Sequence, residues 1–127
     1  MAPDRFPTGL VAGVRHFNAS RFFEAHEAFE DLLEQVEGDD RWELLLALIQ
    51  VAVGYHKCTS GHPGAERMLR LGLKKLAPFP ALTAGVDVDA LRARVAGDLA
   101  ILERGGPLAD HLRQFPPRLR MRRQRDR

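Results

Sequence analysis

The stretch FFEAHEAFEDLL, residues 22–33, places a histidine and several acidic residues among side chains that a helix would bury. His26 and Glu30 are one helical turn apart, and Glu27 follows His26 directly. An imidazole and a carboxylate at this spacing can hold a metal ion, or they can serve as a general base and the group that orients it. They can also satisfy each other inside a core and fix how two helices pack. These residues are therefore the first candidates for a functional site.

The apolar run LLLALIQVAV, residues 44–53, offers partners for this pair, because it is typical of a helix surrounded by other helices. Gln50 is the one polar residue within the run, and a buried amide needs hydrogen-bond partners. We predict a buried polar network of His26, Glu30 and Gln50 that specifies helix packing. The candidate polar site as a whole comprises His26, Glu27, Glu30, Gln50 and His56.

The alternatives are a metal site and an acid–base, hydrolase-like site on the same two helices. Metal ligands would be His26, Glu30 and His56, but the chain lacks the second Glu-x-x-His pair that is usual in helical bundles. Cys58 and Ser60 are the nearest nucleophiles, and no supporting motif accompanies them. We assign no catalytic residue and favour a non-enzymatic structural or partner-binding module. No cofactor is predicted, with a divalent metal as the alternative.

Helical periodicity extends along almost the whole chain. Gly38, Gly61 and the PFP motif at 78–80 are typical helix stops. Connections between the second, third and fourth helices are short, so neighbours should pack antiparallel. The fold class is therefore all-α, a compact bundle of five or six helices built from antiparallel helical hairpins. Helices are predicted over 9–17, from Ser20 as N-cap to Glu37, over 41–59 with Asp39 or Asp40 as cap, from Pro63 to Leu76, over 88–104 with Asp87 as cap, and from Pro107 to before Pro116.

Charge divides the chain of 127 residues into two parts. Residues 113–127 carry seven Arg and one Asp, whereas the other 112 residues carry 12 Lys and Arg against 16 Asp and Glu. We predict one helical domain over 1–112 and a flexible basic tail over 113–127. The tail can associate with nucleic acid by neutralising phosphates, although it lacks the interleaving of aromatic residues that would suggest stacking on bases, and such charge runs are commonly only solubilising. The candidate contacts are Arg118, Arg120, Arg122, Arg123 and Arg125.

Cysteine usage and hydropathy favour a cytoplasmic protein. Cys58 is the single cysteine, so the chain has no internal disulfide framework. The N-terminus, MAPDRFPTG, has no apolar segment typical of a signal peptide. Residues 44–53 are too few to span a bilayer, so we expect no membrane association. The expected partner is an unknown protein or a second copy of the chain.

The segments FNASRFFEAHEAFEDLL and LLALIQVAVGYHKCTSGHPGAERMLRLGLKKL resemble the DUF309 family of small helical proteins. The resemblance covers about residues 10–77, with a weaker echo at 86–91. Leu33 stands where an aromatic residue is usual, Ala47 replaces a glycine, and His62 stands where an asparagine is usual. The resemblance implies an all-α fold of helical hairpins. It implies no biochemical activity, because the function of the family is unassigned.

Overall fold

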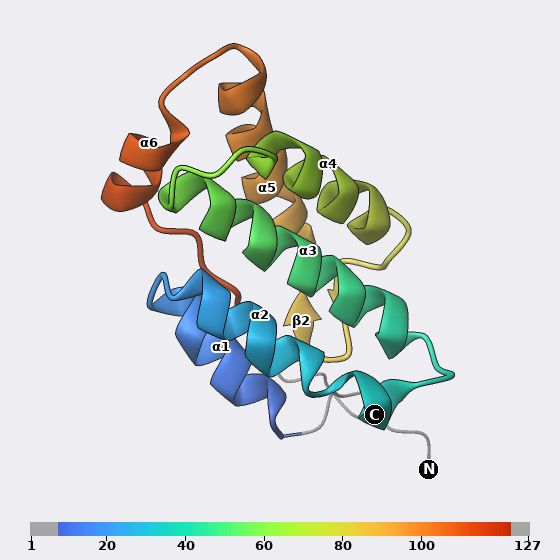
Figure 1. Ribbon diagram of the computed structural model, residues 1–127. Coiled ribbons are helices and arrows are strands. Elements are labelled where there is room, and N and C mark those ends of the chain that lie inside the picture. Colours follow the sequence, from blue (N-terminus) through green and yellow to red (C-terminus); the bar gives the residue numbers. More distant parts are fainter. Residues whose placement is uncertain (1–7, 123–127) are drawn as a thin grey trace.

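The computed structural model describes residues 8–122, which form a bundle of helices and one very short hairpin (Figure 1). The prediction of an all-α fold is confirmed. The two strands are antiparallel and pair Leu82 with Asp87 and Thr83 with Val86. In chain order the elements are α1 (Leu10–Asn18), α2 (Phe22–Glu30), the 3-10 helix η1 (Leu33–Val36), α3 (Arg41–Thr59), α4 (Ala65–Leu76), β1 (Leu82–Thr83), β2 (Val86–Asp87), α5 (Val88–Glu103) and α6 (Leu108–Gln114).

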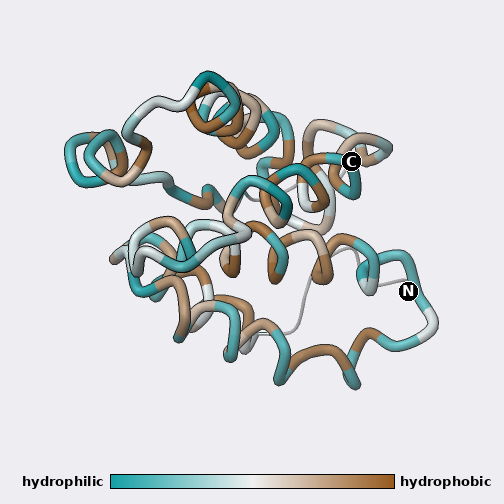
Figure 2. The backbone as a smooth tube through the Cα atoms, turned by 45° about the horizontal axis from the view of Figure 1, so that its top comes forward, coloured by the Kyte–Doolittle hydropathy of each residue, from teal (hydrophilic) through white to brown (hydrophobic). Residues whose placement is uncertain are grey.

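Helix α3 is the centre of the bundle and makes its most extensive contacts with α4 and α2. Its bounds match the prediction, and Asp39 Oδ1 accepts a hydrogen bond from the Arg41 amide at 2.7 Å at its start. Nine of its 19 residues are buried, including Leu48 and Tyr55. Along most other helices, hydrophobic and hydrophilic residues alternate as in amphipathic helices (Figure 2). The core therefore surrounds α3 on several sides.

Helix α2 is shorter than predicted at both ends. Ser20 is not its N-cap, because Ser20 has a left-handed backbone (φ 62°) and its amide instead donates to the Phe17 carbonyl at the end of α1. The α-helix stops at Glu30, and the chain tightens into η1 rather than continuing to Glu37. Leu32 and Val36 are both buried across this change of helix type, so burial of the apolar residues does not require a continuous α-helix.

Helix α4 also begins later than predicted, at Ala65 rather than Pro63. Gly64 precedes it with φ 99°, a left-handed conformation that an α-helix cannot contain. The helix then packs closely on α3, where a Cβ on Gly54 would lie 2.7 Å from Leu69 Cδ2. A Cβ on Gly72 would lie 2.7 Å from Val51 Cγ2. The absence of side chains at these two glycines lets the helices approach each other.

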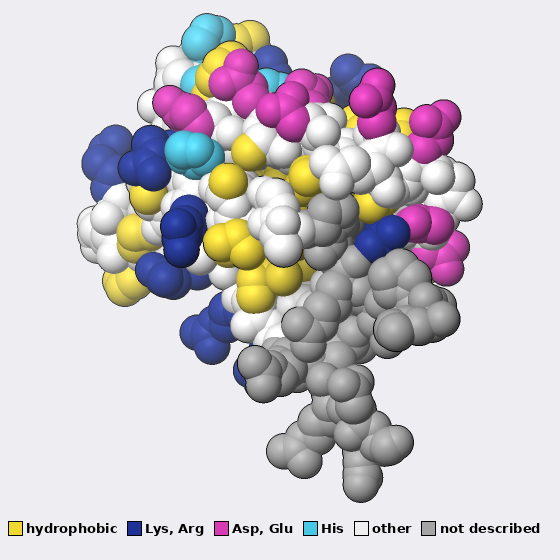
Figure 3. All heavy atoms as spheres, turned by 90° about the horizontal axis from the view of Figure 1, so that it is seen from below, with side chains coloured by type: hydrophobic (Ala, Val, Ile, Leu, Met, Phe, Trp, Pro, Cys, Tyr) yellow, Lys and Arg dark blue, Asp and Glu magenta, His cyan; other side chains and the backbone are white. Residues whose placement is uncertain are grey.

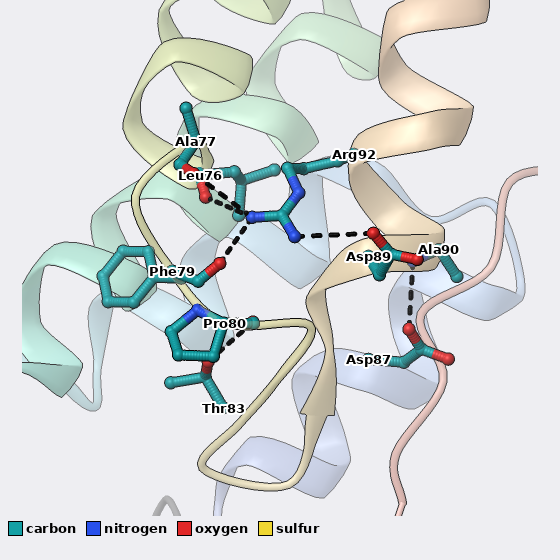
Figure 4. A network of polar contacts seen from close by, with 9 residues as sticks. All are labelled: Leu76, Ala77, Phe79, Pro80, Thr83, Asp87, Asp89, Ala90 and Arg92. Carbon is teal, nitrogen blue, oxygen red and sulfur yellow. Dashed lines mark hydrogen bonds and ion pairs between the residues drawn. The ribbon is translucent and has the colours of Figure 1, made fainter.

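One arginine secures the connection between α4 and α5 (Figure 4). Arg92 donates to the carbonyl of Leu76, the last residue of α4, at 3.0 Å, and to that of Phe79, just beyond it, at 2.6 Å. Asp87 caps α5 as predicted, accepting from the Ala90 amide at 3.0 Å. That hydrogen bond, together with Arg122, lowers the pKa of the Asp87 carboxyl. The cap and the arginine together fix where α5 starts.

The chain after α6 returns across the domain instead of leaving it at residue 112. We call residues 115–122 the C-terminal strap. Leu119 is buried, and its amide and carbonyl both hydrogen-bond the Asn18 side chain, at 2.7 and 3.0 Å. Met121 forms an antiparallel bridge with Val86. Figure 1 shows the segment in red, running from α6 towards α1. This part of the expected flexible tail is therefore packed against the domain.

Candidate functional site

His26 and Glu30 lie at the edge of α2 and not inside the core. The His26 Nε2 atom is 3.5 Å from Glu30 Oε1, and the His26 Nδ1 atom is 3.0 Å from the Phe23 carbonyl oxygen. The side chain of His26 is 18% exposed and that of Glu30 is 52% exposed. Glu27 is also exposed. The buried face of α2 is centred on Phe22, Ala25 and Phe29, which leaves His26 on its margin. The pair is thus a contact at the surface rather than part of a buried network, and such contacts contribute little to stability.

Gln50 is not part of a network with these residues. Its Oε1 atom is buried and has no hydrogen-bond partner within the described residues. The structure therefore does not join His26, Glu30 and Gln50. His26 lies on the margin of the face that α2 buries, and it lines an open pocket whose lining does not include Gln50.

The structure instead brings His26 together with His56. Both line an open pocket of about 270 Å³, which we call the α2–α3 pocket and define by Phe23, His26, Val53, His56, Lys57 and His62. The Phe23 ring centroid lies 5.1 Å from that of His26 and 5.3 Å from that of His56. His62 stacks on His56 with the centroids 6.3 Å apart. Two of the predicted site residues thus share one surface, with a phenyl ring between them.

This arrangement does not assemble a metal centre. Within residues 8–122, no three His, Cys, Asp or Glu side chains lie close enough to hold one metal ion. Phe23 contacts both His26 and His56, and Glu30 reaches only His26. The three ligands expected from the sequence therefore do not converge.

Ser60 and His62 form the pair that comes closest to a nucleophile and base. Ser60 Oγ lies 2.7 Å from His62 Nδ1, and it also donates to the His56 carbonyl at 2.7 Å. A hydroxyl has a single proton, so while Ser60 donates to His56 it can only accept from His62. Activation by a base needs the opposite direction, with the Ser60 hydroxyl donating its proton to the His62 ring. The pair is an exposed turn contact that closes the end of α3.

Cys58 lies nearby and is partly buried. Burial, and then the negative charge of Asp98, raise the pKa of its thiol. A raised pKa keeps the sulfur protonated at neutral pH, whereas nucleophilic cysteines need the thiolate. Cys58 is therefore a packing residue.

The buried polar cluster of this protein is one that sequence reasoning missed. Asp98 of α5 is 1% exposed, and its Oδ2 atom accepts from Tyr55 Oη at 2.6 Å and from Arg94 Nε at 2.8 Å. The Nε2 atom of His111 lies 3.9 Å from Asp98 Oδ1. Burial and the carboxylate raise the pKa of Tyr55 well above its usual value. The Arg94-x-x-x-Asp98 spacing is a visible signal, but Tyr55 is 43 residues away from Asp98.

The arginines of the expected tail fall into two groups. Arg118, Arg120 and Arg122 belong to the C-terminal strap, where Arg122 Nε lies 3.0 Å from Asp87 Oδ2. Arg123 and Arg125 lie outside the described residues. Seen from below, Lys and Arg side chains gather along one edge of the molecule and Asp and Glu side chains along another (Figure 3). Most side chains of opposite charge therefore lie on different edges of this face.

Fold and site together define a small all-helical domain with an open pocket lined by aromatic and histidine side chains. Residues 10–69, which span α1 to the first part of α4, match the family model described as Domain of unknown function (DUF309), and this match supports the assignment to that family. No curated protein matches the chain significantly. None of the helices in the described part of the chain is long and apolar enough to cross a membrane.

Proposed function

We propose that the chain is a non-enzymatic partner-binding module whose contact surface is the α2–α3 pocket. The occupant is a segment of a protein partner that places an apolar side chain beside a carboxylate. The observation that carries the proposal is Phe23, whose 46% exposed ring walls a pocket that carries cationic and hydrogen-bonding groups.

The apolar part of the proposal follows from the cost of exposed phenyl surface. Phe23 and Val53 present carbon atoms from two helices to the same opening. Covering apolar surface is favourable by about 25 cal/mol per Å², and aromatic side chains dominate the energetics of many interfaces. A partner side chain of leucine or phenylalanine size suits a pocket of about 270 Å³.

The carboxylate follows from the polar groups around the opening. Lys57 contributes an ammonium group, and its stem lies along Gly64, 3.5 Å from where a Cβ of that residue would be. His26, His56 and His62 contribute ring nitrogens, and no Asp or Glu of the described residues lines the pocket. An anionic group beside an apolar one is the complementary ligand.

Catalysis is less well supported by the same surroundings. The raised pKa of the Cys58 thiol and the direction of the Ser60–His56 hydrogen bond both leave the neighbouring nucleophiles inactive. Binding of a partner does not require a reactive Cys58 thiol or Ser60 hydroxyl.

The test uses N-acetyl-leucine as a probe, with N-acetyl-leucinamide as the probe lacking the carboxylate. In amide NMR spectra of the full chain, N-acetyl-leucine should shift the signals of Phe23, Val53 and Lys57 with a Kd of about 1 mM or weaker, as expected for so small a ligand. The amide probe should bind several-fold more weakly.

Variants make the test specific. Phe23→Ala and Lys57→Gln should each weaken binding of N-acetyl-leucine, whereas Leu71→Ala, which removes a 37% exposed side chain from α4, should not. Equal binding of the two probes would refute the anionic part of the proposal. Shifts confined to residues elsewhere, or an unchanged affinity in Phe23→Ala, would refute the site.

A further inference from the structure

The C-terminal strap displays its arginines on one side. Pro117 and Leu119 are buried, whereas Arg118 and Arg120 are exposed. Successive side chains of an extended chain point to opposite faces, so burying one set projects the other set into solvent. The two guanidinium groups therefore lie side by side along the strap.

A third guanidinium group joins them. Arg94, with Ala90 and Pro116, lines the same open pocket of about 210 Å³ as Arg118 and Arg120. Arg94 is fixed in place, because it donates to Asp98 Oδ2 at 2.8 Å and to the Phe115 carbonyl. No carboxylate among residues 8–122 lines this pocket. Three positive groups around one opening select an anion, and the planar guanidinium fork matches phosphate.

Positive charge in the pocket is only partly neutralised. The Arg118 side chain makes no hydrogen bond or ion pair with the described residues. The charge of Arg120 contributes to the lowered pKa of the Asp87 carboxyl, and the Arg120 backbone carbonyl accepts a hydrogen bond from the Asp87 amide at 2.9 Å. Arg122, next along the strap, is already paired with Asp87. Arg118 is therefore the group most available to a ligand.

An aromatic ring stands at the end of this row. Phe115 is 57% exposed, more than any other large hydrophobic side chain in the described region. Its backbone carbonyl is held by Arg94, and its ring centroid lies 5.2 Å from that of His111. Phe115 directly precedes Pro116, which lines the cationic pocket, and its exposed ring is not packed into the core. The sequence lacks a regular interleaving of aromatic residues with the arginines, but it has this one aromatic residue between Arg113 and Arg118.

We infer that the strap is a binding site for single-stranded nucleic acid, in which Arg94, Arg118 and Arg120 contact phosphates and Phe115 stacks on a base. A cationic groove with an adjacent aromatic platform is the general design of proteins that bind single strands without sequence preference. The site shares no residue with the α2–α3 pocket and stands independently of the function proposed for that pocket.

The test measures fluorescence anisotropy of a labelled 12-nucleotide oligothymidylate with the full chain, beside a duplex of equal length. The single strand should bind more tightly than the duplex. Three phosphate contacts to a single strand predict a slope of about −2 in a plot of log K against log salt concentration.

Two variants and two matched controls locate the site. Phe115→Ala should weaken binding about tenfold, the effect expected for loss of one stacked base. Arg118→Ala/Arg120→Ala should weaken binding and make the salt slope shallower by about 1.4, because two phosphate contacts are lost. The controls are Leu71→Ala for the exposed apolar side chain and Arg67→Ala/Lys74→Ala for the same loss of charge from the exposed face of α4.

Several outcomes would overturn the inference. They are no binding at 50 mM salt, duplex binding as tight as single-strand binding, Phe115→Ala indistinguishable from Leu71→Ala, and equal effects of the two double variants. Binding to vesicles of anionic phospholipid without binding to the oligonucleotide would also overturn it. Circular dichroism of each variant shows whether the helices are intact. Phe23→Ala should bind the oligonucleotide like the wild type, which separates this site from the α2–α3 pocket.

Discussion

At the scale of single residues, Asp98 is the buried ionisable side chain of the described part of the chain that most needs polar partners. It is 1% exposed, and the Tyr55 hydroxyl and the Arg94 guanidinium both donate to its Oδ2 atom. A buried carboxylate is tolerable only when such donors compensate for lost hydration. The cluster joins α3 to α5 and thereby ties the central helix to the C-terminal half of the fold.

Tyr55→Phe tests this cluster. At pH 7 the variant should lose about 1–3 kcal/mol of unfolding free energy, because Asp98 loses a donor while remaining buried. The difference in unfolding free energy between the wild type and Tyr55→Phe should diminish at high pH. Burial and Asp98 raise the folded pKa of Tyr55, so above about pH 10 the unfolded chain releases the proton and the folded chain keeps it, which favours unfolding. Tyr55→Phe has no hydroxyl to ionise, so its stability is not lowered in this way.

Urea unfolding at pH 7 and pH 10.5 measures both effects. Tyr55 is the only tyrosine in the chain, so its ionisation can also be followed directly by ultraviolet absorbance. Parallel stability curves for the two proteins between these pH values would contradict the assignment of the raised pKa to Tyr55.

The sequence indicated which residues line the site better than it indicated which residues contact one another. His26 and His56 were both candidates, and both line the α2–α3 pocket. Their link is Phe23, which a helical wheel treats as an ordinary apolar residue. The Tyr55–Asp98 pair could not be predicted, because it joins helices whose relative rotation is set only by tertiary packing.

At the scale of elements, the contact between α3 and α4 depends on glycines. Gly54→Ala should lower stability by about 1–3 kcal/mol, the range for overpacked cores. The new methyl carbon would lie 2.7 Å from Leu69 Cδ2 and 3.1 Å from the Leu69 backbone nitrogen, which cannot move aside easily.

Gly97→Ala is the matched control, with an effect of opposite sign. Gly97 lies within α5, and a Cβ there meets nothing within 4 Å. The substitution should raise stability by up to about 1 kcal/mol through helix propensity alone. Chemical denaturation of both variants measures the difference. If both substitutions stabilise the protein, the two helices are not held as closely as described.

The accuracy of predicted element bounds followed the strength of local signals. Helix α3 was correct at both ends, because the Asp39–Asp40 pair and Gly61 mark them clearly. The end of α2 was wrong, since burial of Leu32 and Val36 does not require a continuous α-helix. The β1–β2 hairpin was missed because two-residue strands are too short to show alternation.

At the scale of the whole molecule, the strap makes the C-terminal segment part of the fold. Leu119→Ala should lower stability by about 2–5 kcal/mol, because the side chain is 3% exposed and its truncation leaves a cavity. Met121→Ala, at a 42% exposed position two residues along, should change stability by less than about 0.5 kcal/mol.

Thermal or urea unfolding of the two variants provides the measurement. Equal, small effects would show that residues 115–122 contribute no more than a loosely attached tail. Composition alone favoured that tail, because the seven arginines after residue 112 outweigh the few apolar residues among them. The burial of Leu119 depends on Asn18, whose side chain bonds both backbone groups of Leu119 and which no local pattern connects to the strap.

The pairing of Asn18 with Leu119 also has a consequence for how the protein is made. The two residues are 101 positions apart, so a ribosome working at about 5–20 residues per second needs roughly 5–20 s between them. During that interval α1 to α4 can already pack through contacts of shorter separation, while the surface that Leu119 will cover stays open to water. The nascent chain therefore has a window in which a chaperone can recognise it, and the window closes only when the strap emerges.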